Sequence, residues 1–311
     1  MPANSKWMES ISPGQRVSHC ARFALRLRLK LVDSFLDEVW DSKDPSSDVI
    51  HQLRVSTRRA AATMDGFKEL LPARRAKSLQ KFLKCIRKTA GGARDVDVLA
   101  KRLSEDQQLQ DRWPALIERL EALRRQARRP VAAACAPAQR KDFRRRARRV
   151  LRRIAWAEKD GDEPVFAEIA VDKVRAAAEP FFDAAVGDLS SVDRLHQFRI
   201  FGKHLRYAME IFSPAFGPRF RDELYPMLAS LQDKLGEIND HAEAIKRFEL
   251  WTDQWQESAL QEALAELLEG HRTALVESIA SFGDWWTAER AIAWRQRFDE
   301  VLSSLQVERV A

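Results

Sequence analysis

The chain has 311 residues, of which 45% are hydrophobic and 32% are charged, and its formal net charge at pH 7 is +7. This composition excludes an intrinsically disordered chain and leaves room for one large core or two medium ones. No apolar run approaches the roughly 18 residues of a membrane span, and the N-terminus lacks the basic-then-apolar order of a signal peptide. The three cysteines lie far apart, which argues against a disulfide framework or a zinc ribbon. We therefore expect a cytoplasmic protein that does not bind membranes.

Apolar residues recur at helical spacing along nearly the whole chain, and no segment alternates with the period of a strand. Glycine, proline and serine clusters separate the periodic segments, among them Gly91-Gly92 and the stretch from Gly161 to Pro164. The pattern predicts an all-α fold. The predicted helices span residues 15–41, 47–71, 74–90, 95–108, 112–135, 138–159, 165–187, 191–212, 218–236, 238–253, 255–282 and 284–307.

An internal repeat organises these helices. The segment HQLRVSTR at residues 51–58 recurs as HQFRIFGK at residues 196–203, an offset of 145 residues. The same offset pairs Gly91 with Gly236 and Asp95 with Asp240. We interpret the repeat as an internal duplication that forms two similar helical bundles, with a junction near residues 159–164.

Each repeat carries a stripe of cations on one helix face. At about 100° per residue, the four stripe positions of the second repeat occupy less than a quarter of the helix circumference. The second stripe consists of His196, Arg199, Lys203 and Arg206, opposite the apolar Leu195, Phe198, Leu205, Met209 and Phe212. The first consists of His51, Arg54 and Arg58, with Arg59 beside it, opposite Leu53, Ala60, Met64, Phe67 and Leu71.

The next predicted helix of the first repeat adds a line of lysines, Lys77, Lys81, Lys84 and Lys88, which the second repeat lacks, so we expect an asymmetric site. Successive stripe residues rise about 5 Å along the helix, a spacing that suits a linear polyanion better than a single small anion. The first histidine follows Asp48 and the second follows Ser191 and Asp193; we expect Asp48, and either Ser191 or Asp193, to be helix N-caps. A bound polyanion would favour the protonated imidazoles, so histidine is predicted to make a pH-dependent contact.

These motifs resemble those of the CHAD family, the histidine-containing α-helical domains. The resemblance is carried by HQLRVSTRR with GGARDVDVL and by HQFRIFGKHLRYAMEIF with LQDKLGEIND, and it spans residues 12–305. It implies one domain of two four-helix bundles, residues 12–160 and 164–305, related by a pseudo-twofold. It also implies a basic central groove or pore that binds inorganic polyphosphate, in some members on polyphosphate granules. The ExExK motif of the CYTH enzymes, which are fused to some members, is absent.

Carried over by motif, the binding positions of the family fall on ten residues of this chain. Two departures would thin the cation lining, Ala61 and Ala229, where the family often has a basic residue. Lys77, Lys81, Lys88 and Lys234 are further candidates, and Lys81, Lys88 or Lys234 could compensate for the two departures. The ten residues are His51, Arg54, Arg58, Arg59, Lys84, Arg94, His196, Arg199, Lys203 and Arg206.

Three alternatives compete with polyphosphate binding as interpretations of this sequence. RNA or DNA binding is suggested by residues 124–153, which hold thirteen Lys or Arg and one acid, Asp142, but no nucleic-acid-binding motif accompanies them. The arginines after each motif histidine argue against a metal site, and Asp95 and Asp240 suit capping or an ion pair with a stripe arginine. A metal-dependent phosphohydrolase would need a His-Asp dipeptide, whereas the chain has Asp240-His241.

The sequence therefore predicts a non-catalytic polyphosphate-binding protein, granule-associated or scaffolding, with no cofactor, metal or catalytic residue. We expect the basic segment 124–153 to be a largely solvated helix, or an outer surface that raises the association rate of any polyanion. The C-terminal tryptophans are expected to belong to the core.

Overall fold

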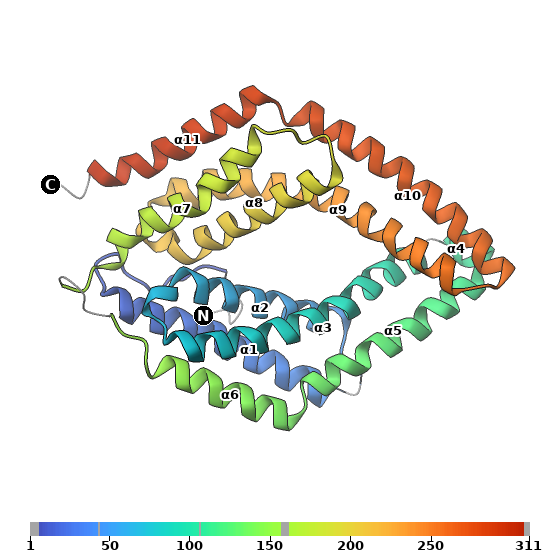
Figure 1. Ribbon diagram of the computed structural model, residues 1–311, viewed down its shortest axis with the longest axis horizontal. Coiled ribbons are helices and arrows are strands. Elements are labelled where there is room, and N and C mark those ends of the chain that lie inside the picture. Colours follow the sequence, from blue (N-terminus) through green and yellow to red (C-terminus); the bar gives the residue numbers. More distant parts are fainter. Residues whose placement is uncertain (1–5, 43, 106, 157–161, 308–311) are drawn as a thin grey trace. The chain divides into compact units, whose positions relative to one another are not determined.

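The computed structural model describes residues 6–42, 44–105, 107–156 and 162–307. These residues are almost entirely helical and include no strand, only an isolated bridge between Arg16 and Val165. Their all-α architecture confirms the predicted fold class (Figure 1). No helix in this part of the chain is both long and apolar enough to cross a membrane.

The chain forms two compact units, which we call unit 1 and unit 2. Unit 1 contains Gly14–Val165, and unit 2 contains Trp7–Pro13 together with the chain from Phe166 onward. The Trp7–Pro13 segment joins unit 2 because the ring of Trp7 packs at 4.8 Å from that of Tyr225 and the Pro13 carbonyl accepts a 3.0 Å bond from Ala167 N.

In unit 1, α1 and α3 each pack against both α2 and α6, so that these four helices enclose a common core. The helix α5 packs along α3, and α4 connects the two. The helices are α1 (Val17–Asp41), α2 (Ser47–Gly66), α3 (Ala73–Glu105), α4 (Gln107–Arg112), α5 (Pro114–Ala134) and α6 (Pro137–Leu151), with a 3₁₀ turn at Lys68–Leu70.

In unit 2, α8 packs between α7 and α9, while α10 runs along α9 and α11 contacts α7. The helices are α7 (Phe166–Ala185), α8 (Val192–Phe212), α9 (Tyr225–Gln254), α10 (Ser258–Trp285) and α11 (Ala288–Val307). A 3₁₀ turn at Ser213–Ala215 and a π-helical turn at Phe220–Leu224 connect α8 to α9. The motif helices α2 and α8 thus occupy the same place in the order of their units, each followed by a long helix.

The predicted apolar faces of both motif helices are buried, as amphipathic packing requires. Serines begin these helices: Ser46 Oγ accepts a 3.3 Å bond from Val49 N, and Ser191 Oγ accepts a 3.4 Å bond from Arg194 N. The N-cap of α2 is therefore Ser46 rather than the expected Asp48, which lies in the first turn. The buried apolar residues are Leu53, Ala60, Met64, Phe67 and Leu71 on the α2 side and Leu195, Phe198, Leu205, Met209 and Phe212 on α8.

Two predicted breaks between helices are wrong, and one helix is shorter than predicted. Gly91-Gly92 lies inside the continuous helix α3, and Gly236 lies inside α9, so neither long helix is interrupted. A glycine in a helix interior costs about 1 kcal/mol relative to alanine, and packing against neighbouring helices outweighs this cost here. Asp95 and Asp240 consequently sit within helices rather than near their starts. The helix predicted to reach residue 159 ends at Leu151.

Among the C-terminal tryptophans, Trp251, Trp255 and Trp286 are buried, and Trp251 and Trp255 stack with ring centroids 4.8 Å apart. The ring of Trp294 packs edge-on against Trp286 at 4.9 Å. The expectation that these residues form core is confirmed for the buried three, while Trp285 and Trp294 are half-buried at its edge.

Candidate functional site

The first stripe lies on α2, where four cationic side chains are half-buried. His51, Arg54 and Arg58 follow one another at helical spacing, with Arg59 beside them, above the buried face that begins with Leu53. Partial burial reduces solvent screening of these charges, which strengthens their interaction with an anion. The sequence therefore placed these four residues together correctly.

Arg54 and Arg94 connect this stripe to α3. Arg54 Nη1 lies 3.7 Å from Asp95 Oδ1, the ion pair that the sequence suggested for this aspartate. The guanidinium also lies beside Gly91 of α3, because a Cβ atom built on that residue would be 3.6 Å from Arg54 Nε. Arg94 donates through Nη1 to Ser47 Oγ in the first turn of α2. These contacts gather the cations of the two helices at the start of α2.

His51 is electrostatically disfavoured as a cation. Its pKa is lowered from the ordinary value by burial first, then by the charges of Arg94 and Arg54, while Asp48 acts in the opposite direction. Among the described residues its buried Nδ1 has no hydrogen-bond partner. An anion bound beside this residue would offset the neighbouring positive charges and so favour the protonated imidazole.

The second stripe lies on α8, with an exposed His196 and half-buried Arg199, Lys203 and Arg206. The proximity of Arg54 to Gly91 recurs in unit 2, between Arg199 and Gly236 of α9. A Cβ atom built on Gly236 would be 3.8 Å from Arg199 Nη2. The matched arginine–glycine contact occurs in both units at the offset of the repeat.

The two motif histidines differ in their partners. His196 Nδ1 lies 2.7 Å from Asn239 Oδ1, at the edge of a small hollow of about 80 Å³ that also contains Lys246. Asn239 is the residue that the repeat pairs with Arg94. In unit 1, Arg94 lowers the pKa of His51, whereas at the matched position of unit 2 the amide of Asn239 contacts His196. The two stripes are therefore chemically different.

Arg206 interacts chiefly with its own unit. Burial lowers its pKa, but the neighbouring Tyr207 and Glu210 outweigh that effect, so the pKa is raised overall. Glu210 is buried and accepts a 2.9 Å bond from the Tyr225 hydroxyl. Arg206 therefore interacts with groups in the interior of unit 2.

Sequence reasoning did not single out Gly202 and Gln232. The Gln232 amide donates a 3.2 Å bond to the Arg199 carbonyl, and a Cβ atom on Gly202 would lie 2.2 Å from Gln232 Nε2. Any side chain at residue 202 would displace Gln232, so this glycine permits the close approach of α9 to α8 at the stripe. The glycine inside a helical motif was the available signal.

The four lysines of the α3 line, Lys77, Lys81, Lys84 and Lys88, are all exposed, opposite the buried Leu79, Leu83 and Ile86. From residue 73 to Arg94 this helix contains no acid. The remaining candidate, Lys234, lies on α9 with its Nζ 5.2 Å from the Trp285 ring. Ala61 and Ala229 are half-buried.

The basic segment 124–153 is less solvated than expected. Asp97 of α3 is fully buried, and its Oδ1 lies 2.7 Å from Arg124 Nε and 3.0 Å from Arg128 Nη2. On α6, Arg144 binds Asp33 at 2.8 Å and Asp37 at 2.8 Å. Several arginines of this segment therefore hold unit 1 together, because they link α5 to α3 and α6 to α1.

In the described parts of the chain, no three His, Cys, Asp or Glu side chains are grouped as a metal site would require. His241 and His271, for which the sequence suggested no relationship, contact each other with their Nδ1 atoms 3.0 Å apart, between α9 and α10. Two ring nitrogens alone fall short of the three or four ligands typical of a zinc site.

Fold and stripes together define an all-α protein with paired cationic helix faces. The chain belongs to the CHAD domain family, whose profile matches residues 24–249. The motif resemblance predicted a domain over residues 12–305, whereas the family match covers a shorter range and ends within α9. No curated protein matched the chain.

Two solved structures share this fold. The chain is similar to the CHAD domain from the plant Ricinus communis, with a TM-score of 0.72 and 19% identity over 87% of this chain and 93% of the other. It is also similar to PptA from Streptomyces chartreusis, with a TM-score of 0.62 and 17% identity over 92% of this chain and 100% of the other.

Proposed function

We propose that this protein binds inorganic polyphosphate through the cation stripes of α2 and α8, without chemically altering it. The CHAD family is linked to polyphosphate binding in general. The observation that carries the proposal for this chain is the recurring contact of a stripe arginine with a helical glycine, Arg54 with Gly91 and Arg199 with Gly236. In each pair the absence of a side chain on the glycine leaves room for the guanidinium, which lies next to further cations.

The chemistry of the stripes suits a linear phosphate polymer. Arginine offers a planar fork of N–H donors that can bind phosphate oxygens bidentately, and lysine adds a mobile point charge. Successive stripe positions lie about one helical turn apart, so several phosphate groups of one chain can be contacted together. The groove or pore expected between the two repeats, and the equal role of all ten carried-over residues, stay predictions.

The functional consequence that we propose is electrostatic capture, with the protein acting as a granule-associated or scaffolding component in the cytoplasm. Turnover is not part of the proposal, since the stripes contain donors to phosphate but no paired nucleophile and base. If incubation with the protein shortens polyphosphate or releases orthophosphate, the non-catalytic assignment is wrong.

The first experiment is a competition titration with long-chain polyphosphate, tRNA and duplex DNA, matched for phosphate concentration, over a range of salt. Affinity for polyphosphate should exceed that for both nucleic acids by at least about tenfold and persist at physiological salt, because non-specific cation–polyanion binding weakens steeply with salt. Equal binding to all three, or a preference for tRNA, would contradict the proposal.

The site is tested with the double variant Arg54→Gln and Arg199→Gln. Glutamine avoids the new repulsion that glutamate would create beside Asp95. Loss of two charge-assisted contacts should weaken binding roughly a hundredfold, while far-ultraviolet circular dichroism stays unchanged. The matched control replaces the exposed Arg125 and Arg129 of α5 by Gln, which removes the same charge elsewhere in the molecule. Equal affinity in both double variants would refute the site assignment.

A further inference from the structure

A second cationic surface lies on α6. Apart from Arg144, which pairs with α1, the exposed cations here are Lys141, Arg145, Arg148, Arg149, Arg152 and Arg153, and we call these six the α6 arginine surface. All but Arg153 line an open hollow of about 780 Å³ along this helix. Arg153 joins Arg149, Arg152 and Arg75 of α3 around an adjoining hollow of about 510 Å³, which is lined by these arginines alone.

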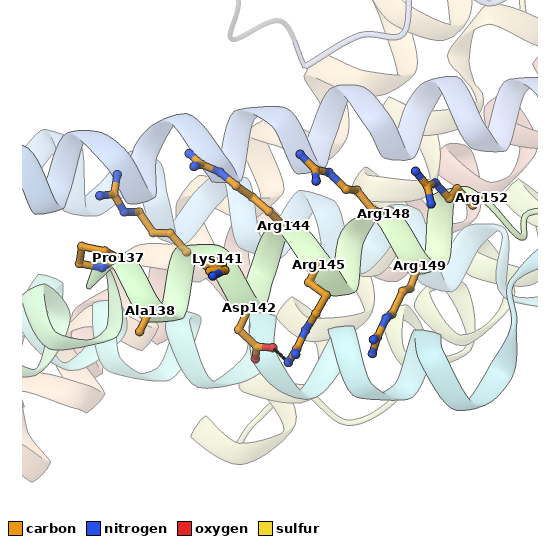
Figure 2. A pocket seen from close by; sticks show the side chains of 10 residues that line it. Pro137, Ala138, Lys141, Asp142, Arg144, Arg145, Arg148, Arg149 and Arg152 are labelled. Carbon is orange, nitrogen blue, oxygen red and sulfur yellow. Dashed lines mark hydrogen bonds and ion pairs between the residues drawn. The ribbon is translucent and has the colours of Figure 1, made fainter.

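The arginines stand in two rows along the helix. Figure 2 shows Arg148 and Arg152 projecting to one side of α6, in line with Arg144, and Arg145 and Arg149 projecting to the other. Members of a row are four residues apart, which is about one turn or 6 Å along the axis. Guanidinium forks therefore flank the outer face of α6 on both sides, so that a linear anion lying along the helix would meet donors from two directions.

Little of this charge is neutralised. Within the described part of the chain, Arg148, Arg149, Arg152 and Arg153 make no ion pair, whereas Arg145 binds Asp142 and Arg144 binds Asp33 and Asp37. Arg144 also lines the larger hollow, so part of that lining is engaged with α1. Among the described residues, no ion pair accounts for the presence of the other four arginines.

The helix dipole explains only part of the pattern. Cations near a helix C-terminus are stabilising, which covers Arg148, Arg149 and Arg152. It does not cover Lys141 and Arg145, which lie further from the end of the helix at Leu151. Like charges four residues apart repel, and Lys141–Arg145, Arg145–Arg149 and Arg148–Arg152 each destabilise the helix by a few tenths of a kcal/mol. An anionic ligand would convert this repulsion into attraction.

The α6 arginine surface is separate from the α2 stripe. Helices α1 and α3 each contact both α2 and α6, and Figure 1 shows α2 and α6 on opposite sides of this pair. A short linear anion seated on α2 would therefore leave the outer face of α6 free.

We propose that the α6 arginine surface is a second binding site for polyphosphate, so that unit 1 can hold two strands on opposite sides. This inference rests on the proposed function, because it assigns the same ligand to a further site. Polyphosphate is favoured over a nucleic acid because the smaller hollow is lined only by arginine, with no aromatic ring to stack on a base.

The test uses the full-length protein and the double variant Arg148→Gln and Arg152→Gln. The matched control is again Arg125→Gln with Arg129→Gln, a pair of exposed arginines with the same spacing in the same unit. A calorimetric titration with a short polyphosphate of defined length measures the number of polyphosphate chains bound per protein. We expect R148Q/R152Q to bind one chain fewer at saturation than the control, with unchanged helicity and thermal unfolding.

Bridging provides a second measurement. A protein with two separate sites should crosslink long-chain polyphosphate into particles detectable by light scattering, and R148Q/R152Q should scatter at least about threefold less than the control. If R148Q/R152Q matches the control in both stoichiometry and scattering, the second site is refuted. If it loses affinity for tRNA while its binding of polyphosphate is unchanged, the surface binds nucleic acid and the inference is again wrong.

The stripe variant R54Q/R199Q separates this inference from the proposed function. Adding R148Q/R152Q to it should remove the remaining short-chain binding if both statements hold. If R54Q/R199Q binds as tightly as the unmodified protein but R148Q/R152Q does not, the proposed stripe site fails and the α6 site stands. If the unmodified protein binds no polyphosphate, both fail.

Discussion

The guanidinium group of Arg54 lies beside Gly91, where an added Cβ atom would be 3.6 Å from Nε. That separation is an ordinary van der Waals contact, so alanine fits at residue 91 without moving the arginine. A longer side chain would occupy the space of the guanidinium. The glycine thus sets where the first arginine of the stripe can lie.

Substitutions at Gly91 should separate helix stability from binding. Gly91→Ala is expected to raise the free energy of unfolding by about 0.5–1 kcal/mol, because alanine restricts the unfolded chain and favours helix, and to keep polyphosphate affinity. Gly91→Leu should displace Arg54 and weaken binding several-fold. The control is Gly92→Leu, since a Cβ atom there meets nothing within 4 Å. Urea denaturation and titration measure the two effects; equal affinities for G91L and G92L would contradict the positioning role.

Asp95 competes with an anionic ligand for Arg54. The ion pair between them is 3.7 Å long and partly exposed, so it contributes little to stability and its loss should cost less than about 0.5 kcal/mol. Asp95→Asn releases Arg54 and removes a negative charge from the site, and we expect polyphosphate affinity to rise by about two- to fivefold. Glu105→Gln, which removes one charge from the exposed end of the same helix, should leave the affinity nearly unchanged. Weaker binding by D95N would argue against the competition.

The pH dependence of binding should report on His51. The pKa of His51 is lowered in the free protein by burial and by Arg94, and bound phosphate should raise it. Affinity then increases as pH falls from the raised pKa of the complex towards the lowered pKa of the free protein, and levels off below both. Polyphosphate should bind more tightly at pH 6 than at pH 8. A flat profile in this interval would exclude a titrating contact by either motif histidine.

Arg94→Asn isolates the electrostatic part of this effect. It places in unit 1 the residue type that unit 2 has at the matched position, Asn239. Removing the charge of Arg94 should raise the pKa of His51, as measured by the pH titration of its ring proton resonances, while burial continues to lower it. Arg87→Asn removes a cation from the same helix that does not act on His51. An identical His51 titration in both variants would contradict the assigned cause.

Asp97 should matter for stability rather than for binding. Its carboxylate is fully buried and binds Arg124 and Arg128, so Asp97→Asn leaves two arginines without a charged partner at that position. We expect the free energy of unfolding to fall by about 2 kcal/mol or more in urea denaturation. Asp44→Asn removes the exposed partner of Arg128 and should cost less than about 0.5 kcal/mol. Equal losses in both variants would show that burial of Asp97 is not decisive.

Helical periodicity was sufficient to predict the fold class and both stripes. The apolar faces of α2 and α8 lie where the spacing placed them, because side chains three or four residues apart share one side of a helix whatever that helix packs against. The stripes and the apolar faces depend on local geometry, which a linear sequence contains. For Asp95 the sequence left capping and an ion pair with a stripe arginine as alternatives, and the packing of α3 against α2 decided between them.

The positions of the glycines show where local reasoning failed. Gly91 and Gly236 were predicted to end helices because glycine disfavours a helix. In the structure α3 is continuous where it packs against α2, and α9 is continuous where it packs against α8. The close approach of Gln232 to Gly202 belongs to the same class, since it depends on how two helices cross. Such contacts join residues distant in the chain, and propensity carries no information about them.

Packing also sorted the arginines of the basic segment into two kinds, which composition could not do. Arg124 and Arg128 neutralise a buried aspartate of α3, and Arg144 pairs with α1, whereas Arg148 and Arg152 face outward. The sequence alone determined that this segment is cationic and helical. Which charges stabilise the bundle and which remain available to a ligand depended on where acidic groups from α1 and α3 came to lie, because an ion pair needs a partner within about 4 Å in space rather than along the chain.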